Sequence, residues 1–147
     1  MGYQERQGNR IMYEYRCIIV EVVDGDTIDI DIDLGFGVWM RGERIRLDGV
    51  DTPESRTSDA VEKKFGLLAK HFVEEKLPVG KEAVLLSKQF RGKFGRILGD
   101  IRVDGKILTE ELISNHLAVP YHGENKGTLS AAHQENRKIL MEQGKIL

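Results

Sequence analysis

The chain has 147 residues and a formal net charge of −2, with 40% hydrophobic and 31% charged residues. This composition is ordinary for a soluble globular protein, and the chain is long enough to bury a core without disulfides. No apolar run approaches the roughly 20 residues that cross a bilayer, and the slightly acidic balance argues against binding nucleic acid through bulk charge.

The chain is predicted to consist of a polar N-terminal tail, residues 1–12, and a single domain, residues 13–147. Met1–Arg10 has no apolar core followed by small residues, so it does not resemble a secretory signal. A cytoplasmic protein is the default expectation, and a mature exported chain, which would look the same, stays open. The single cysteine, Cys17, lies in an apolar run and is interpreted as a core residue.

A first strand is expected over residues 14–24, which are rich in Tyr, Ile and Val. It ends at Asp24-Gly25, a hairpin signal, and Asp24 is interpreted as a turn residue.

The second predicted strand, Asp26 to Asp33, alternates strictly between isoleucine and polar residues. Asp29, Asp31 and Asp33 share one face and are interpreted as solvated. Asp26 falls in phase with the isoleucines instead, and a carboxylate on an apolar face needs a partner such as a metal ion or an arginine.

The third predicted strand, residues 38–48, leads into the densest chemical stretch of the chain, residues 46–54. Pro53 cannot donate to a sheet ladder, so the extended pattern should stop there. Asp51, Thr52 and Glu54 would then lie at a strand end, where loops carry function. Phe36 and Trp39, near the preceding turn, are interpreted as a plug of the barrel end.

The period changes to helical over residues 58–77, where Val61, Phe65, Leu68 and Phe72 follow at spacings of four, three and four. Gly66 inside this helix costs about 1 kcal/mol against alanine, which suggests close packing.

Two more strands, residues 81–90 and 96–103, are joined by a basic turn, and helices are expected from Thr109 and over Ser130–Gln143. The last helix carries a thin apolar stripe of Leu129, Ala132 and Leu140. Three strands, a helix and two strands are the element order of an OB barrel. The predicted fold is therefore α+β, a five-stranded OB-type β-barrel with three helices.

Charged groups from three distant segments are expected at the strand ends of this barrel. Asp26 and Asp51 are hard oxygen donors that, with the Thr52 carbonyl, suit Ca²⁺ or a similar cation. Glu54 is the natural general base for an attacking water. Arg46 and Arg96 match a phosphate with planar forks and would stabilise charge in the transition state.

Each of these residues also has a plain structural interpretation. An isolated copy of residues 51–54 is more often a capped turn, and an arginine in an alternating strand is usually solvated. The four histidines lack the spacing of zinc ligands and receive no role in the site; they are His71, His116, His122 and His133.

Three segments carry a family resemblance: Val23-Asp24-Gly25-Asp26-Thr27, Arg46 followed by Val50-Asp51-Thr52-Pro53-Glu54, and Lys93-Phe94-Gly95-Arg96. They resemble the signature segments of the staphylococcal nuclease (thermonuclease) family, in the same order and at similar spacing. The resemblance implies an OB barrel and Ca²⁺-dependent cleavage of DNA and RNA at the 5′-oxygen side, leaving 3′-phosphate ends. It implies metal ligation by Asp26, Asp51 and the Thr52 carbonyl, Glu54 as base, and phosphate clamping by Arg46 and Arg96.

Substrate contacts are expected beside these groups. Between Lys88 and Lys106 there are six basic and two acidic residues, enough for a local phosphate track. Phe94 stands where the family often has tyrosine, so it could stack on a base beside Lys93. Tyr121 is a second stacking candidate, and the alternative that it only packs the last helices stays open.

The leading hypothesis is thus a metal-dependent phosphodiesterase acting on DNA or RNA, with no membrane or obligate protein partner, as a monomer. The alternative is an OB-fold module that binds nucleic acid without cleaving it. A third hypothesis, a protein-interaction domain, leaves the acids at the strand ends unexplained.

Overall fold

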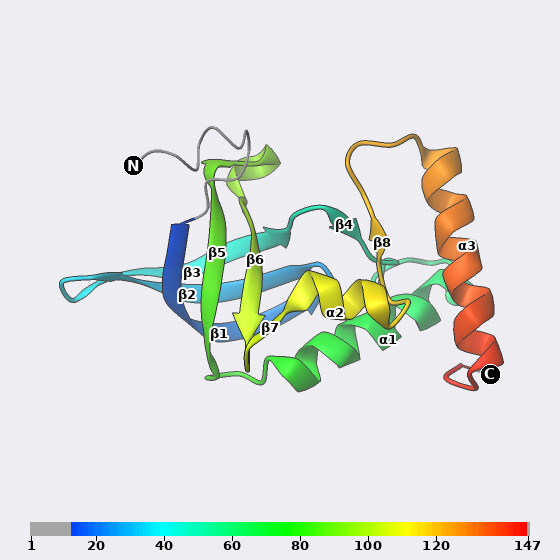
Figure 1. The fold of residues 1–147 in the computed structure, drawn as a ribbon, viewed down its shortest axis with the longest axis horizontal. Coiled ribbons are helices and arrows are strands. Elements are labelled where there is room, and N and C mark those ends of the chain that lie inside the picture. The colour runs from blue at the N-terminus through cyan, green and yellow to red at the C-terminus, as the bar shows by residue number, and fades with distance from the viewer. Residues whose placement is uncertain (1–12, 147) are drawn as a thin grey trace.

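The computed structural model describes residues 13–146, so the predicted tail, residues 1–12, lies outside the described residues (Figure 1). The order of elements matches the expected order, with short additions. The elements are β1 (Tyr13–Asp24), β2 (Thr27–Gly35), β3 (Val38–Leu47), β4 (Val50–Asp51), α1 (Ala60–Lys76), β5 (Glu82–Arg91), the 3₁₀ turn η2 (Lys93–Gly95), β6 (Ile97–Val103), β7 (Lys106–Ile107), α2 (Leu108–Ser114), β8 (Val119–Pro120) and α3 (Lys126–Glu142).

The sheet closes on itself. Its strands lie in the order β3-β2-β1-β5-β6-β7, and a parallel pairing between β3 and β6 joins the two ends. Gly99 of β6 also lies close to the neighbouring strand β5, because a Cβ on Gly99 would meet the Leu86 carbonyl oxygen at 2.4 Å. The predicted five-stranded OB-type barrel with three helices is confirmed.

The barrel core follows from the alternation of the strands. Ile28, Ile30 and Ile32 are buried inside it, and Cys17 is buried beside them as expected. The opposite face of β2 differs from the prediction, because its three aspartates are ion-paired and not simply solvated. The pairs are Asp29 with Arg44 at 2.9 Å, Asp31 with Arg41 at 3.1 Å and Asp33 with Arg16 at 2.7 Å.

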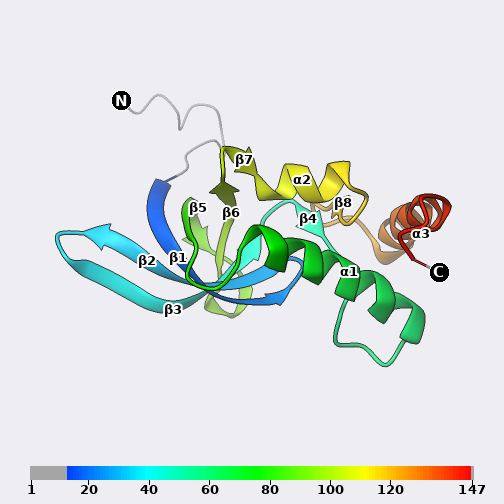
Figure 2. The same ribbon diagram turned by 90° about the horizontal axis from the view of Figure 1, so that it is seen from below.

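The β2–β3 hairpin extends from one end of the molecule, and α3 lies at the other end (Figures 1 and 2). Phe36 at the hairpin tip is fully exposed, with φ of +59°. The interpretation of Phe36 and Trp39 as a barrel plug is therefore wrong: the tip leads away from the core. The Trp39 ring instead contacts two guanidinium groups, with its centroid 4.8 Å from that of Arg41 and 5.6 Å from that of Arg16.

Helix α1 runs beneath the barrel and packs against β1 (Figure 2). Asp59 caps it by accepting hydrogen bonds from the backbone N–H groups of Val61 and Glu62. Phe65 is buried on the predicted stripe, whereas Val61, at the first turn, is 53% exposed.

Helix α3 begins four residues before its predicted start at Ser130. Asn125 caps it by accepting a hydrogen bond from the Thr128 N–H, so the helix tolerates Gly127 in its first turn. Among residues 13–146, no helix is long and apolar enough to cross a bilayer.

Gly66 of α1 lies against the backbone of the segment before the helix. A Cβ at this position would meet the Glu54 carbonyl oxygen at 2.2 Å and the Ser55 nitrogen at 2.6 Å. The expected close packing is confirmed. It holds the backbone of Glu54 and Ser55 directly against helix α1.

Gly66→Ala should destabilise the protein although alanine favours helix. The gain in helix propensity is about 1 kcal/mol, whereas forcing an extra carbon into a filled contact costs roughly 1–3 kcal/mol. Urea unfolding measures the net loss.

Gly127→Ala is the matched control, since an added Cβ there meets only the flexible Asn125 side chain, at 3.3 Å. It should leave stability within about 1 kcal/mol of the wild type. A Gly66→Ala protein as stable as this control would contradict the proposed contact.

Candidate active site

One cleft of about 530 Å³ collects charged groups from the β1–β2 turn, from the end of β3 with the segment after it, and from the β5–β6 turn. These segments are far apart in sequence and meet because the barrel closes. The cleft is lined by Val23, Asp24, Asp26, Thr27, Arg44, Arg46, Asp51, Glu54, Arg56, Phe94, Gly95 and Arg96.

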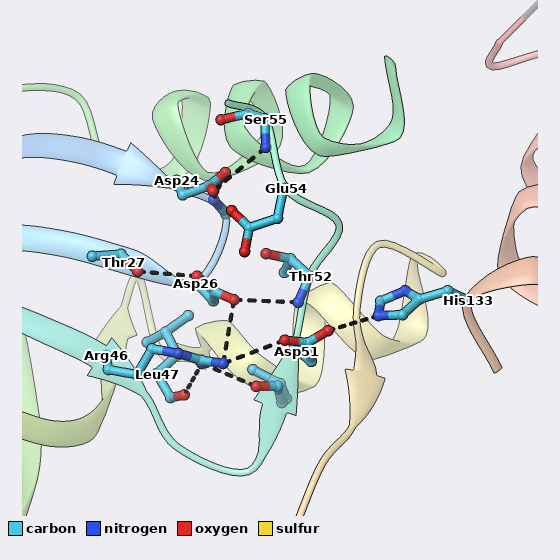
Figure 3. Close-up of polar contacts among 12 residues, drawn as sticks. Asp24, Asp26, Thr27, Arg46, Leu47, Asp51, Thr52, Glu54, Ser55 and His133 are labelled. Atoms are coloured by element: carbon cyan, nitrogen blue, oxygen red, sulfur yellow. Dashed lines mark hydrogen bonds and ion pairs between the residues drawn. The ribbon is translucent and has the colours of Figure 1, made fainter. Parts of the chain in front are cut away.

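Arg46 lies at the centre of the polar contacts in this cleft (Figure 3). Its Nη1 donates to the backbone carbonyls of Leu47 at 2.6 Å and Val50 at 3.0 Å. Its Nη2 lies 3.4 Å from Asp26 Oδ2 and 3.5 Å from Asp51 Oδ1. A single guanidinium group, 17% exposed, therefore balances two carboxylates and fixes the bend after β3.

Asp26 is buried, as its phase with the isoleucines indicated. The Thr27 hydroxyl lies 3.0 Å from its Oδ1, and the backbone N–H of Thr52 donates to its Oδ2 at 3.3 Å. Thr52 is buried too, and its hydroxyl has no hydrogen-bond partner among the described residues. The partner that the sequence required for Asp26 is, in this structure, Arg46.

The Glu54 side chain reaches the cleft from the segment seated on Gly66 (Figure 3). Partial loss of water, followed by the negative charges of Asp24, Asp26 and Asp51, raises the pKa of Glu54 above its ordinary value. Once ionised, a carboxylate with a raised pKa is a stronger base than an ordinary glutamate.

Asp24 takes part in the cleft as well as in the turn. Its Oδ1 accepts a hydrogen bond from the Gly25 N–H at 3.0 Å, which fits the predicted turn. Its Oδ2 also faces the Ser55 N–H at 3.5 Å, next to Glu54. The interpretation of Asp24 as a turn residue alone was too narrow, since an Asp-Gly signal says nothing of contacts across the fold.

Arg96 follows the η2 turn and lines the cleft together with Phe94 and Gly95 of that turn. Its Nε donates to the Lys93 carbonyl at 3.3 Å, and its guanidinium lies 5.5 Å from the centroid of the Phe94 ring. Phe94 itself is 91% exposed with φ of +61°. The turn thus presents a cation and an aromatic face together.

A second groove, of about 720 Å³, adjoins the cleft and shares Arg46, Asp51 and Arg96 with it. Lys93 and Tyr121 both line this groove. The structure therefore brings Lys93, Phe94 and Tyr121 to the walls of one continuous depression.

The expected phosphate track over residues 88–106 is largely neutralised by ion pairs. Of its six cations, only Lys93 and Arg96 have no ion pair within the described residues. The four pairs are Lys88 with Asp48, Arg91 with Glu43, Arg102 with Glu14, and Lys106 with Glu111. The free positive charge of this region is concentrated at the cleft.

Sequence reasoning missed two further residues. Arg56 lines the cleft, is exposed and has no ion pair among residues 13–146. His133 of α3 reaches the site from 82 positions away, with its Nε2 2.8 Å from Asp51 Oδ2. The prediction that no histidine takes part in the site is wrong for His133. Its helical phase with the apolar Leu140, seven residues on, was the available signal that it faces the barrel.

Asp26 and Asp51 offer hard oxygen donors, which suit a cation such as Ca²⁺. Among residues 13–146, no group of three or more His, Cys, Asp and Glu side chains is arranged as a metal site. The two carboxylates would therefore need backbone or water oxygens to complete a coordination shell. Four acids line the cleft together with four arginines. After the effect of burial, the negative charges of the other acids raise the pKa of Glu54, and a cation bound among the acids would relieve this mutual repulsion.

Comparison with known proteins gives a consistent picture. Residues 44–141 match the family model described as staphylococcal nuclease homologue. Thermonuclease of Staphylococcus intermedius is 30% identical over 101 residues, which cover 69% of this chain and 56% of the relative. Thermonuclease of Staphylococcus hyicus is 29% identical over 100 residues, which cover 68% of this chain and 56% of the relative. Endonuclease YhcR of Bacillus subtilis (strain 168) is 30% identical over 115 residues, 74% of this chain and 9% of the relative. The chain spans about half the length of the two thermonucleases.

Arg46→Lys should destabilise the protein although it keeps the charge. A single ammonium group cannot serve two carbonyls and two carboxylates from two separate nitrogens. Loss of the contacts should cost roughly 1–3 kcal/mol, measured by urea unfolding.

Arg41→Lys, also in β3, is the control because Arg41 pairs with Asp31 on the outer face and is 67% exposed. Such a surface pair contributes about 1 kcal/mol or less. Equal losses in the two variants would show that Arg46 has no special structural part.

Proposed function

The chain belongs to the staphylococcal nuclease family, and from this membership we propose that it is a Ca²⁺-dependent nuclease. It hydrolyses phosphodiester bonds of DNA or RNA and leaves 3′-phosphate ends. Three relatives named as thermonucleases or as an endonuclease support the activity, and the family resemblance of the three motifs supports the choice of ion and product.

The observation that carries this proposal is the convergence of opposite charges in one cleft. Asp26, Asp51 and Glu54 line this cleft together with the guanidinium groups of Arg46 and Arg96. Guanidinium groups recognise phosphate oxygens bidentately, and a carboxylate beside them can take a proton from water. A module that only binds nucleic acid gains nothing from four acids in its binding cleft, because they repel phosphate.

Glu54 is proposed to be the general base. Its carboxylate would accept the proton of a water that attacks phosphorus, and the rigid seat on Gly66 holds it at the cleft. Correct placement of the attacking group supplies much of the rate of such a reaction.

Arg46 and Arg96 are proposed to hold the scissile phosphate and to stabilise the negative charge that builds on its oxygens. Arg96 carries no ion pair among the described residues, so its full charge is available to a ligand. Lys93, Phe94 and Tyr121 line the continuation of the depression, and we assign them to the flanking nucleotides.

Asp26 and Asp51, with the Thr52 carbonyl, would hold the Ca²⁺ ion. A cation there polarises a phosphoryl oxygen and lowers the pKa of bound water. The chain's own part is to supply two carboxylates already fixed by Thr27, Thr52 and Arg46.

Single-stranded DNA incubated with the protein should be cleaved in the presence of Ca²⁺ and left intact with a chelator. The products should carry 3′-phosphates, as shown by end-group analysis. Absence of cleavage across a series of divalent cations would refute the nuclease, and cation-independent binding without cleavage would favour the binding module.

Glu54→Gln should keep Ca²⁺ and DNA binding but lose turnover by roughly 10²–10⁴-fold, since the amide cannot accept the proton. Steady-state kinetics with DNA binding measured alongside separates the two effects. Glu75→Gln, an exposed glutamate of α1, is the control and should be fully active. A Glu54→Gln protein with normal turnover would remove Glu54 from the mechanism.

A further inference from the structure

Helix α3 makes a polar contact with the proposed metal site. His133 Nε2 lies 2.8 Å from Asp51 Oδ2, and the His133 side chain is only 13% exposed (Figure 3). An ionised carboxylate only accepts hydrogen bonds, so Nε2 must carry the proton and donate it. The contact is thus a hydrogen bond to a charged group, which is among the stronger kinds.

The attachment of α3 to the rest of the molecule is otherwise slight. Leu140 is its one buried residue within the described part of the helix. The Asn136 amide donates to the Ala118 carbonyl at 3.2 Å, and the Arg137 guanidinium lies 5.4 Å from the centroid of the Phe65 ring. His133, Asn136 and Arg137 fall on one face of the helix, three and four positions apart. Much of the docking of α3 therefore depends on polar contacts, and one of them ends on Asp51.

The two oxygens of Asp51 have different partners. Oδ2 accepts from His133 on the α3 side, whereas Oδ1 lies 3.5 Å from Arg46 Nη2 on the barrel side. The terminal torsion of an aspartate is soft, so a carboxylate without contacts would rotate. Contacts at opposite oxygens hold this carboxylate in one orientation, with Oδ1 directed to the cleft that contains Asp26.

We propose that His133 is a positioning residue that orients the Asp51 carboxylate and thereby couples the docking of α3 to cation binding. The inference rests on the proposed function for the cation, whereas the coupling of α3 to Asp51 is a property of the metal-free protein. Hydrogen-bond partners of metal-ligating groups commonly raise metal affinity by roughly 10–100-fold. By reciprocity, a cation that favours the oriented carboxylate also favours the docked helix.

The first test compares His133→Phe, which keeps a ring without a donor, with His133→Gln, which keeps an N–H at similar reach. Calorimetric titration with Ca²⁺ alone should show affinity weakened roughly 10–100-fold in His133→Phe and largely restored in His133→Gln. His71→Gln, an exposed histidine of α1, is the control and should bind as the wild type does. In DNA cleavage, His133→Phe should be impaired at low Ca²⁺ and regain turnover as Ca²⁺ saturates the site.

The second test follows amide hydrogen exchange of α3. In the metal-free protein, His133→Phe and Asp51→Ala should each lower the protection of α3 amides against exchange by at least about tenfold. This is the effect expected when one hydrogen bond to a charged group is lost. The double variant should lose no more than either single variant. Adding Ca²⁺ should raise protection of α3 in the wild type and not in His133→Phe.

The outcomes separate this inference from the proposed function. Wild-type affinity for Ca²⁺ in His133→Phe would overturn the positioning role while leaving the nuclease intact. Unchanged exchange of α3 in both single variants would overturn the coupling. A wild-type protein that binds no divalent cation would instead refute the proposed metal site, and with it the predicted effect on affinity.

Discussion

The rest of the site depends on the guanidinium group of Arg46. Asp26 lies on the apolar side of β2 and is buried, and a buried carboxylate is tolerated only with a partner of opposite charge. Arg46 provides that charge to Asp26 and to Asp51 at once, and its other nitrogen holds the carbonyls of the bend after β3. The same guanidinium group therefore both fixes the backbone of this bend and partly neutralises these two carboxylates.

The closure of the barrel gives this arrangement its rigidity. The parallel pairing of β3 with β6 places Arg46 opposite Leu98, two residues beyond Arg96. Below the cleft, Gly66 of α1 admits the backbone of Glu54 and Ser55 at contact distance. The acidic and basic residues of the site are therefore supported by strands and a helix of one packed core. A preorganised site requires this kind of support.

The distribution of charge explains how a chain with net charge −2 could still bind a polyanion. On the outer face of β2 and along β5 and β6, cations are matched with acids. Lys93, Arg56 and Arg96, which line the depression, have no ion pair within the described residues. Attraction for phosphate is then local, and affinity should depend less on non-specific contacts made elsewhere on the surface.

The sequence by itself determined the barrel, because alternation in the strands, the helical period of residues 58–77 and the order of elements depend on local patterns. It also separated Asp26 from its neighbouring aspartates by phase alone, and the three motifs indicated which charged residues share one site. Only the tertiary structure decided that Arg46 is the partner of Asp26, that cations of the basic turn region are mostly paired, and that Asp24 contacts the Glu54 segment. It alone revealed His133 beside Asp51. These contacts join residues up to 88 positions apart, and no local pattern encodes which distant side chain fills the space beside a given carboxylate.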